Sequence, residues 1–228
     1  PVSVFNAVGG TWAYSYFFAS PFEEATILVF DGAGEEVSTT LAVGSGTSLK
    51  VLRSIPWPHS LGHFYSTMTG FLGFTMLDGE YKLMGLAPYG APEHLSFIRS
   101  NMLMTDKPGS YRLNPALVDY HAALQGHFAP SLRQVFGEPR KDDGAPFTHR
   151  HQQIASSTQA AFEEVVLDLA VWTFQEGGHR RNLAIAGGCG LNCAANGRLL
   201  RDGPFERIYV PPAPHDAGCT VGAALLVY

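Results

Sequence analysis

Two aspartates are the residues of this sequence whose type and position most clearly suggest chemistry. Asp31 opens an Asp-Gly turn directly after the apolar run 25–30, and Asp216 precedes the last apolar segment of the chain. Carboxylates at the ends of neighbouring strands suit Mg²⁺ or another divalent ion that bridges a nucleotide. Each aspartate taken singly also fits an ordinary turn or a helix N-cap. The pair favours a metal–nucleotide site, and the structural interpretation of each residue stays open.

A glycine-rich corner at 187–192 is the second candidate. It reads Gly-Gly-Cys-Gly-Leu-Asn and lies between the apolar run 183–186 and a segment of helical character. Gly187 and Gly188 allow a sharp turn and a close approach to a ligand. Asn192 is predicted to cap the following helix, whose N-terminal N–H groups and dipole favour an anion. The corner therefore predicts a nucleotide site, although plain strand-to-helix packing uses the same pattern.

Hydrophobic patterning predicts the elements that position these residues. Short apolar runs between turn residues indicate strands, and apolar positions three or four apart indicate helices. The stretch 91–150 is richer in Pro, charge and His and reads as an insertion of short helices and loops, with a hairpin near 111–113. The predicted strands are 25–30, 37–43, 49–55, 183–186 and 208–210, and the predicted helices begin after Gly10, at His59, at 152 (to 176), after Asn192 and at Cys219 (to Tyr228).

The order of these elements is that of a ribonuclease-H-like lobe. Three antiparallel strands are followed by a helix, an insertion, and then alternating helices and strands, which predicts an α/β fold with a mixed sheet and flanking helices, of the actin and sugar-kinase type. We assign residues 21–228 to this lobe, with the insertion at about 91–150, and residues 1–20 to the remnant of a first lobe or a linker helix. In such lobes the first hairpin, here with Gly32 and Gly34, grips phosphates through backbone N–H groups.

Length, composition and charge argue against a nucleic-acid-binding protein and against a membrane-spanning one. The chain has 228 residues and a formal net charge of −5, so a nucleic-acid partner is not expected. No apolar run reaches the roughly 18 residues that a transmembrane helix needs, and the first residues do not form a signal peptide. The chain begins without Met and looks entered partway.

Cysteine and histidine positions suggest no further site. Three cysteines give no disulfide framework and suggest the reducing cytoplasm. They lack the spacing of a structural zinc site, so we expect small buried residues. Four histidines of the insertion region also lack metal-site spacing and are expected to be surface or structural residues. These residues are Cys189, Cys193 and Cys219, and His121, His127, His149 and His151.

Four segments together resemble the O-carbamoyltransferase family, which includes the nodulation carbamoyltransferases and the tailoring enzymes of cephamycin and tobramycin. They occur in family order across nearly the whole chain. The segments are Ser20-Pro21-Phe22-Glu23-Glu24-Ala25 leading to Asp31-Gly32-Ala33-Gly34-Glu35; His59-Ser60-Leu61-Gly62 leading to Glu80 through Gly90; Gly187 through Gly197; and Pro211-Pro212 through Asp216-Ala217-Gly218 to Gly222-Ala223-Ala224-Leu225.

The resemblance implies two ribonuclease-H-like lobes and a carbamoyl transfer that depends on ATP. Carbamoyl phosphate and ATP give carbamoyl-adenylate, and the carbamoyl group passes to a hydroxyl of a small molecule in secondary-metabolite or antibiotic biosynthesis. The family holds a metal, reported as iron, with histidines and aspartates. Carried over by motif and topology, the expected catalytic residues are Asp31, Asp216 and Lys82. The expected nucleotide contacts are Gly32, Gly34, Gly85, Gly187, Gly188 and Asn192. The expected ligands of the metal (Fe or Mg) are Asp31 and Asp216, with His215 as a substitute for a lost ligand.

The sequence departs from the family pattern at the metal site. The family's His-His-x-x-His cluster falls on Val8, Gly9 and Trp12, which cannot replace it. His215 stands where the family more often has glycine, and it also fits an ordinary histidine at a helix start. We expect a partner chain or further segments to complete the site and form the adenylate. Two alternatives stay open: a degenerate, non-catalytic nucleotide-binding or scaffold subunit, and a sugar-kinase-like or acetate-kinase-like ATPase.

Overall fold

The computed structural model describes residues 17–34, 36–141 and 144–218. The chain divides into two compact units, which we describe separately. Unit 1 comprises residues 1–62, 107–110 and 166–228, and unit 2 comprises residues 63–106 and 111–165. Of the helix predicted after Gly10, only the end is described, where Phe17 and Phe18 are helical. The predicted final helix, 219–228, lies outside the described residues.

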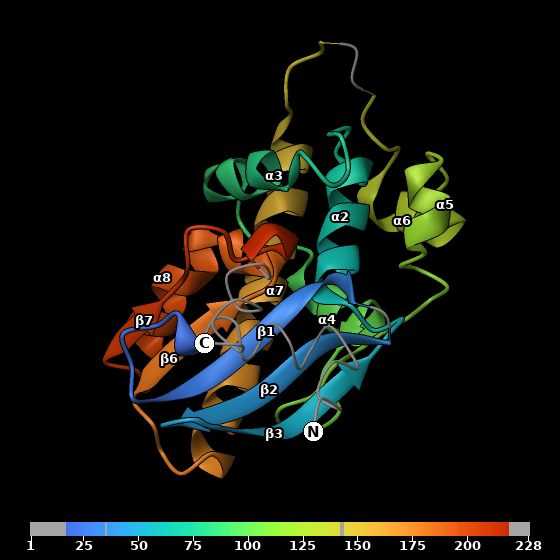
Figure 1. Ribbon diagram of the computed structural model, residues 1–228. Helices are drawn as coiled ribbons and strands as arrows, with labels where there is room; N and C mark the ends of the chain where they lie inside the picture. The colour runs from blue at the N-terminus through green and yellow to red at the C-terminus, as the bar shows by residue number, and fades with distance from the viewer. Residues whose placement is uncertain (1–16, 35, 142–143, 219–228) are drawn as a thin grey trace. The chain divides into compact units, whose positions relative to one another are not determined.

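Unit 1 is built on a five-stranded mixed sheet with the strand order β3-β2-β1-β6-β7 (Figure 1). β2 runs antiparallel to both β1 and β3, whereas β6 is parallel to β1 and β7 is parallel to β6. The strands are β1 (Glu24–Gly34), β2 (Val37–Ser45), β3 (Ser48–Pro56), β6 (Asn182–Ala186) and β7 (Arg207–Tyr209), so all five predicted strands are confirmed.

The central strand β1 carries the candidate aspartate. Its residues from Ala25 to Phe30 are buried on both faces, which explains the continuous apolar run. The pairing with β2 shifts register between Phe30 and Gly34. The prediction that Asp31 lies in a hairpin turn is wrong: the residue lies in an irregular, bulged part of the strand. Bulges of this kind re-aim side chains and occur beside functional sites.

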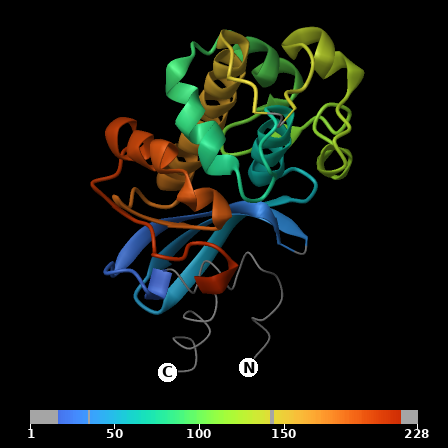
Figure 2. The ribbon, with the colours of Figure 1, turned by 90° about the horizontal axis from the view of Figure 1, so that it is seen from above.

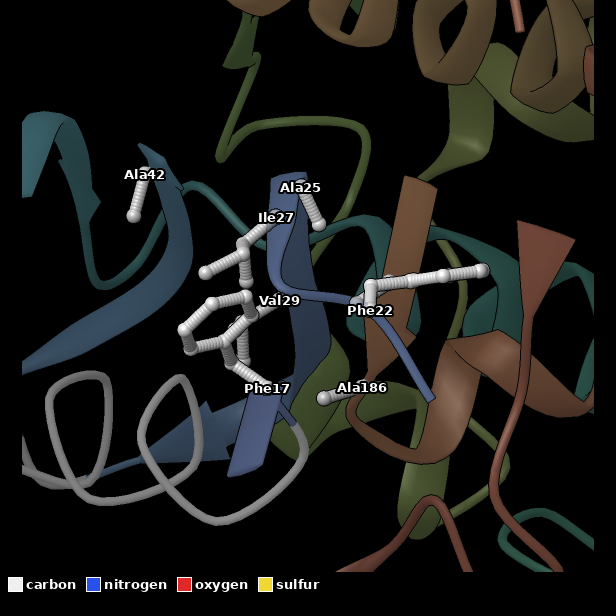
Figure 3. Packing of buried hydrophobic residues seen from close by; sticks show 8 residues of the cluster. Phe17, Phe22, Ala25, Ile27, Val29, Ala42 and Ala186 are labelled. Atoms are coloured by element: carbon white, nitrogen blue, oxygen red, sulfur yellow. The ribbon is translucent and has the colours of Figure 1, made fainter. Parts of the chain in front are cut away.

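Helices cover one face of this sheet and an apolar cluster covers the other. Figure 2 shows α8 (Cys193–Asp202) and the C-terminal part of α7 (His149–Glu176) on one face. On the opposite face Phe17 and Phe22 pack against small side chains of three strands (Figure 3). A Cβ atom on Gly44 would lie 2.6 Å from the ring of Phe17, so the small residues let this ring lie directly on the sheet. The small residues of the cluster are Ala25, Ala42, Ala184 and Ala186.

Unit 2 is largely helical. Its core contains edge-to-face contacts of Phe71 with Phe128 and Phe136, with ring centroids 5.2 and 5.8 Å apart. β4 and β5 form a two-stranded antiparallel pair, which confirms the hairpin predicted near 111–113. The elements are α2 (Leu61–Phe71), α3 (Glu80–Leu86), the 3₁₀ helix η1 (Ala87–Tyr89), α4 (Leu95–Asn101), β4 (Leu103–Met104), β5 (Arg112–Leu113), α5 (Tyr120–Leu124), α6 (Pro130–Phe136) and the N-terminal part of α7; α2 begins in unit 1.

The two longest predicted helices are confirmed with small changes in their limits. The helix expected from His59 begins at Leu61, and the helix expected at 152–176 begins at His149 and ends at Glu176 as predicted. Gly178 follows with a positive φ of 81°, which ends the helix at the predicted glycine pair. Among the described residues, none of the helices combines the length and apolar character needed to cross a membrane.

Candidate functional site

Asp31 is fixed by two backbone N–H groups that donate to its carboxylate. Oδ2 accepts from Gly188 at 2.9 Å, and Oδ1 accepts from Gly32 at 2.5 Å. The first bond links the end of β1 to the glycine corner after β6, and these strands are parallel neighbours. Gly34, the other glycine expected near phosphates, is buried and pairs with Val37. The structure therefore brings together Asp31, Gly32 and Gly188 as the sequence predicted.

The corner itself depends on Gly187. Its φ is 88° and its ψ is 157°, a backbone conformation open essentially only to glycine. A Cβ atom there would lie 2.1 Å from the carbonyl oxygen of Phe30. The Gly187 N–H donates to the carbonyl of Pro214 at 2.7 Å, which joins the corner to the loop before Asp216. Glycine is required here for both the conformation and the close approach to β1.

After the corner, η2 (Gly188–Leu191) leads into α8. Oδ1 of Asn192 accepts the N–H of Ala195 at 3.0 Å, so the predicted helix cap is confirmed. The neighbouring Asn196 donates from Nδ2 to the carbonyl of Gly190 at 2.8 Å. These two bonds hold the corner and the first turn of α8 in one arrangement.

Asp216 and His215 lie beside this corner. Asp216 begins the 3₁₀ helix η3 (Asp216–Gly218), and both side chains are exposed. Burial raises the pKa of Asp31, whereas the N–H groups of Gly188 and Gly32 oppose the increase. The negative charge of Asp216 raises this pKa further and the charge of His215 lowers it. Asp31 is therefore electrostatically coupled to both residues that the sequence placed at the same site.

The side chains near Asp31 decide whether the metal expected from the sequence fits this site. Across residues 17–34, 36–141 and 144–218, no group of three or more His, Cys, Asp or Glu side chains is arranged to hold a metal ion. Both carboxylate oxygens of Asp31 already accept a backbone N–H. A divalent ion left with two carboxylates and water is bound weakly. These residues alone do not fit a tightly held metal.

Lys82 and Gly85 lie on α3 in unit 2. The Lys82 side chain is exposed, and its Nζ lies 5.7 Å from the centroid of the Tyr81 ring. Gly85 is also exposed, and a Cβ atom there would meet nothing within 4 Å. No close approach inside unit 2 therefore explains this glycine, and its expected contact with a nucleotide stays a prediction.

The prediction that the cysteines are buried is wrong for two of them. Cys189 is half-buried and Cys193 is exposed, although both were expected to be buried. Cys193 is the first residue of α8, where the side chain next to the cap faces water. Cys219 lies outside the described residues. The four histidines agree with the prediction of surface or structural residues, because His121, His127 and His149 are exposed and His151 is buried on α7.

Two further residues contact the bulged part of β1 at Asp31 and Gly32 and were not predicted as site residues. The hydroxyl of Ser60 donates to the carbonyl oxygen of Asp31 at 2.8 Å. A Cβ atom on Gly62 would lie 2.6 Å from both N and Cα of Gly32. Both belong to the segment 59–62, which contributed to the resemblance without an assigned role. The resemblance of this segment to the family pattern is the signal that could have indicated them.

The sequence of this chain is similar to those of several known proteins. The family described as carbamoyltransferase N-terminus matches residues 1–225. An uncharacterized protein, sll1178, from Synechocystis sp. is 45% identical over 228 residues, which are 100% of this chain and 37% of that protein. Nodulation protein NolNO of Sinorhizobium fredii is 41% identical over 94% of this chain and 30% of its own length. Nodulation protein NolO of Bradyrhizobium diazoefficiens is 39% identical over 94% of this chain and 37% of its own.

The chain spans only about a third of the length of these relatives. Among solved structures, the crystal structure of T. kodakarensis HypF aligns with 95% of this chain and 35% of that one. Its sequence identity is 16% and its TM-score is 0.44, too low to support an argument about the fold or the site.

Proposed function

Because the chain belongs to the carbamoyltransferase N-terminus family, we propose that it forms the nucleotide-binding lobe of an ATP-dependent O-carbamoyltransferase. The resemblance to the nodulation carbamoyltransferases is confirmed by relatives about 40% identical over 94% of the chain. The proposed substrates are ATP, carbamoyl phosphate and a small molecule with a hydroxyl group. Since the chain covers about a third of these relatives, further segments or a partner chain would supply the remaining machinery.

The observation that carries the proposal is the bond between Gly188 and Asp31. It lies at the carboxyl ends of β1 and β6, where the sheet continues to β2 on one side and to β7 on the other. In open α/β sheets, ligands bind outside the carboxyl ends of strands at such a switch point. The strand order and directions also support the ribonuclease-H-like lobe that we propose for unit 1.

The glycine corner would hold the phosphate of the adenylate. The N-terminus of α8 attracts negative charge through its dipole and its backbone N–H groups. Asn192 and the Gly187–Pro214 bond keep this terminus in place before the nucleotide arrives. Binding to a preorganised site costs less free energy than ordering a loop at the moment of binding.

In the proposed transfer step, the acceptor oxygen bonds to the carbamoyl carbon of carbamoyl-adenylate. The bond between that carbon and the adenylate phosphate oxygen breaks, AMP leaves, and the hydroxyl proton passes to solvent or a nearby base. The corner would contribute by holding the departing phosphate, on which negative charge develops. The roles expected of Lys82 and Gly85 on α3 of unit 2, in catalysis and in nucleotide contact, stay proposals.

A divalent metal, Mg or Fe, remains a proposal at Asp31 and Asp216, with His215 as a third candidate ligand. The described residues do not form a three-ligand group, so the nucleotide phosphates or residues outside the described ranges would have to complete the coordination. With its coordination completed in that way, the ion would supply positive charge that offsets the negative charge of the nucleotide phosphates.

Calorimetry with ATP, and carbamoyl-phosphate-dependent exchange of pyrophosphate into ATP, test the function. The proposal predicts saturable nucleotide binding by this chain, and pyrophosphate exchange that depends on carbamoyl phosphate once the further segments or the partner chain are added. Absence of nucleotide binding would contradict it and leave the non-catalytic scaffold. Phosphate transfer to a hydroxyl, without carbamoyl transfer, would contradict it in favour of the kinase-like alternative.

A further inference from the structure

We infer that Ser60 and Gly62, at the start of α2, are positioning residues that set the orientation of the Asp31 carboxylate. The importance of that orientation for ligand binding rests on the proposed function. Ser60 is fully buried, and its hydroxyl donates to the carbonyl oxygen of Asp31 at 2.8 Å. This bond joins residues that are 29 positions apart in the chain.

The peptide group between Asp31 and Gly32 transmits this bond to the carboxylate. Its C=O accepts the Ser60 hydroxyl, and its N–H donates to Oδ1 of Asp31 at 2.5 Å. A peptide group is planar, so its C=O and N–H rotate together. Rotation of the plane would break both bonds. Ser60 therefore fixes the plane, the plane fixes one carboxylate oxygen, and the other oxygen is then presented to Gly188 at 2.9 Å.

Gly62 holds the same peptide group sterically. A Cβ atom at position 62 would lie 2.6 Å from N and Cα of Gly32 and 2.8 Å from the carbonyl carbon of Asp31. Real Cβ atoms essentially never lie this close to another non-bonded heavy atom, and backbone cannot swing aside as a long side chain does. The absence of a side chain at position 62 thus lets residues 60–62 lie directly against the bulged part of β1.

The segment before α2 is itself anchored. The Ser38 hydroxyl on β2 contacts the carbonyl oxygens of His59 and Ile55, the latter at 3.2 Å. The His59 N–H donates to the carbonyl of Pro56 at 3.1 Å. Ser60 is therefore presented to Asp31 from a segment that β2 and β3 hold in place, which a positioning role requires.

The test follows the Gly188 amide signal by NMR in protein labelled with ¹⁵N-glycine, with the signal assigned from its loss in Gly188→Ala. Ser60→Ala should move it upfield, because its bond to the Asp31 carboxylate weakens. Ser60→Cys fills nearly the same space but is a weak donor. It should shift the signal in the same direction, which separates the hydrogen bond from the effect of a cavity.

The matched control is Ser157→Ala on α7. The Ser157 hydroxyl donates to the carbonyl of Gln153 at 2.7 Å and accepts from the N–H of His94 at 2.9 Å, so this variant also removes buried hydrogen bonds. It should leave the Gly188 signal unchanged. An unchanged Gly188 signal in both Ser60 variants would overturn the inference.

ATP affinity is the second measurement. At metal sites, loss of a residue that orients a binding group costs about 10- to 100-fold in affinity or activity. Ser60→Ala should weaken ATP binding by about tenfold and Gly62→Ala by more, while Ser157→Ala should not. Failure of Gly62→Ala to fold leaves the test to the two Ser60 variants. If the Gly188 signal moves while the unmodified protein binds no ATP, the positioning role stands and the proposed function fails.

Discussion

The main-chain nitrogen of Gly188 lies 2.9 Å from Oδ2 of Asp31, although 157 positions separate the two residues in the chain. This bond joins the bulged end of β1 to the corner after β6. It converts two separately ambiguous patterns, an Asp-Gly pair and a glycine-rich turn, into one site. The corner has its N–H aimed at the carboxylate because Gly187 takes a backbone conformation that other residues avoid.

Gly187→Ala should therefore destabilise unit 1 strongly. The new Cβ atom would meet the Phe30 carbonyl oxygen at 2.1 Å, in addition to the strain of φ at 88°. The matched control is Gly46→Ala, which also has a positive φ, 55°, but open space around its Cβ. We expect Gly187→Ala to lower the free energy of unfolding by about 2 kcal/mol more than Gly46→Ala does. Equal losses in urea denaturation would show that the close approach is not a constraint.

Asn192→Ala should remove the cap of α8. Loss of a helix cap costs about 1 kcal/mol, and here it should also weaken ATP binding because the first turn of the helix loses its support. Asp119→Ala is a close control, since the Asp119 carboxylate caps α5 by accepting the N–H of Ala122 at 3.0 Å. Both variants should lose similar stability, and only Asn192→Ala should lose nucleotide affinity in calorimetry. Equal ATP affinity in the two variants would contradict a role for the α8 terminus.

His63 should make the stability of unit 2 depend on pH. Burial, helped by the charge of His121, lowers the pKa of His63 from 6.5 to about 4. Its ring stacks on Tyr120 with centroids 3.9 Å apart. The unfolded chain binds a proton at this residue at higher pH than the folded chain does. The contribution of neutral His63 to the free energy of unfolding is therefore fully present above pH 6.5 and is lost as the pH falls towards 4.

The loss through His63 should be on the order of 2 kcal/mol, after discounting for water that reaches the ring. His63→Phe keeps an aromatic ring against Tyr120 but cannot take up a proton. Denaturation at a series of pH values should show the unmodified protein losing stability relative to His63→Phe between pH 6.5 and 4. A constant difference across this interval would rule out a neutral, buried His63.

The strands of the sheet could be predicted from the sequence because each is a short apolar run bounded by turn residues. The same local signals identified Asn192 as a cap, since a helix cap forms within a few residues. The bulge at Asp31 was not readable, because register depends on the strand that pairs with it. The exposure of Cys193 was not predicted for a related reason. Where its side chain points depends on the residue at which α8 begins, and the residue type does not determine this.

The contribution of Ser60 and Gly62 could not be predicted from the residues themselves. Serine before a helix ordinarily suggests a cap, and a single glycine suggests only flexibility. Their contacts with Asp31 and Gly32 follow from the folding of residues 60–62 against β1 inside unit 1. The metal proposal reflects the same limit, because ligand sets are assembled from distant segments and no three-ligand group is found in the part of the chain that the structure describes.

The most direct test of the central claim is to titrate ATP into ¹⁵N-glycine-labelled protein and follow the amide signals of Gly187, Gly188 and Gly190. The account predicts that these three signals shift together along one saturable curve, and that Asn192→Ala moves the curve to higher ATP concentration. Saturable ATP binding that leaves all three signals in place would show that the nucleotide binds elsewhere and would contradict the assignment of this corner.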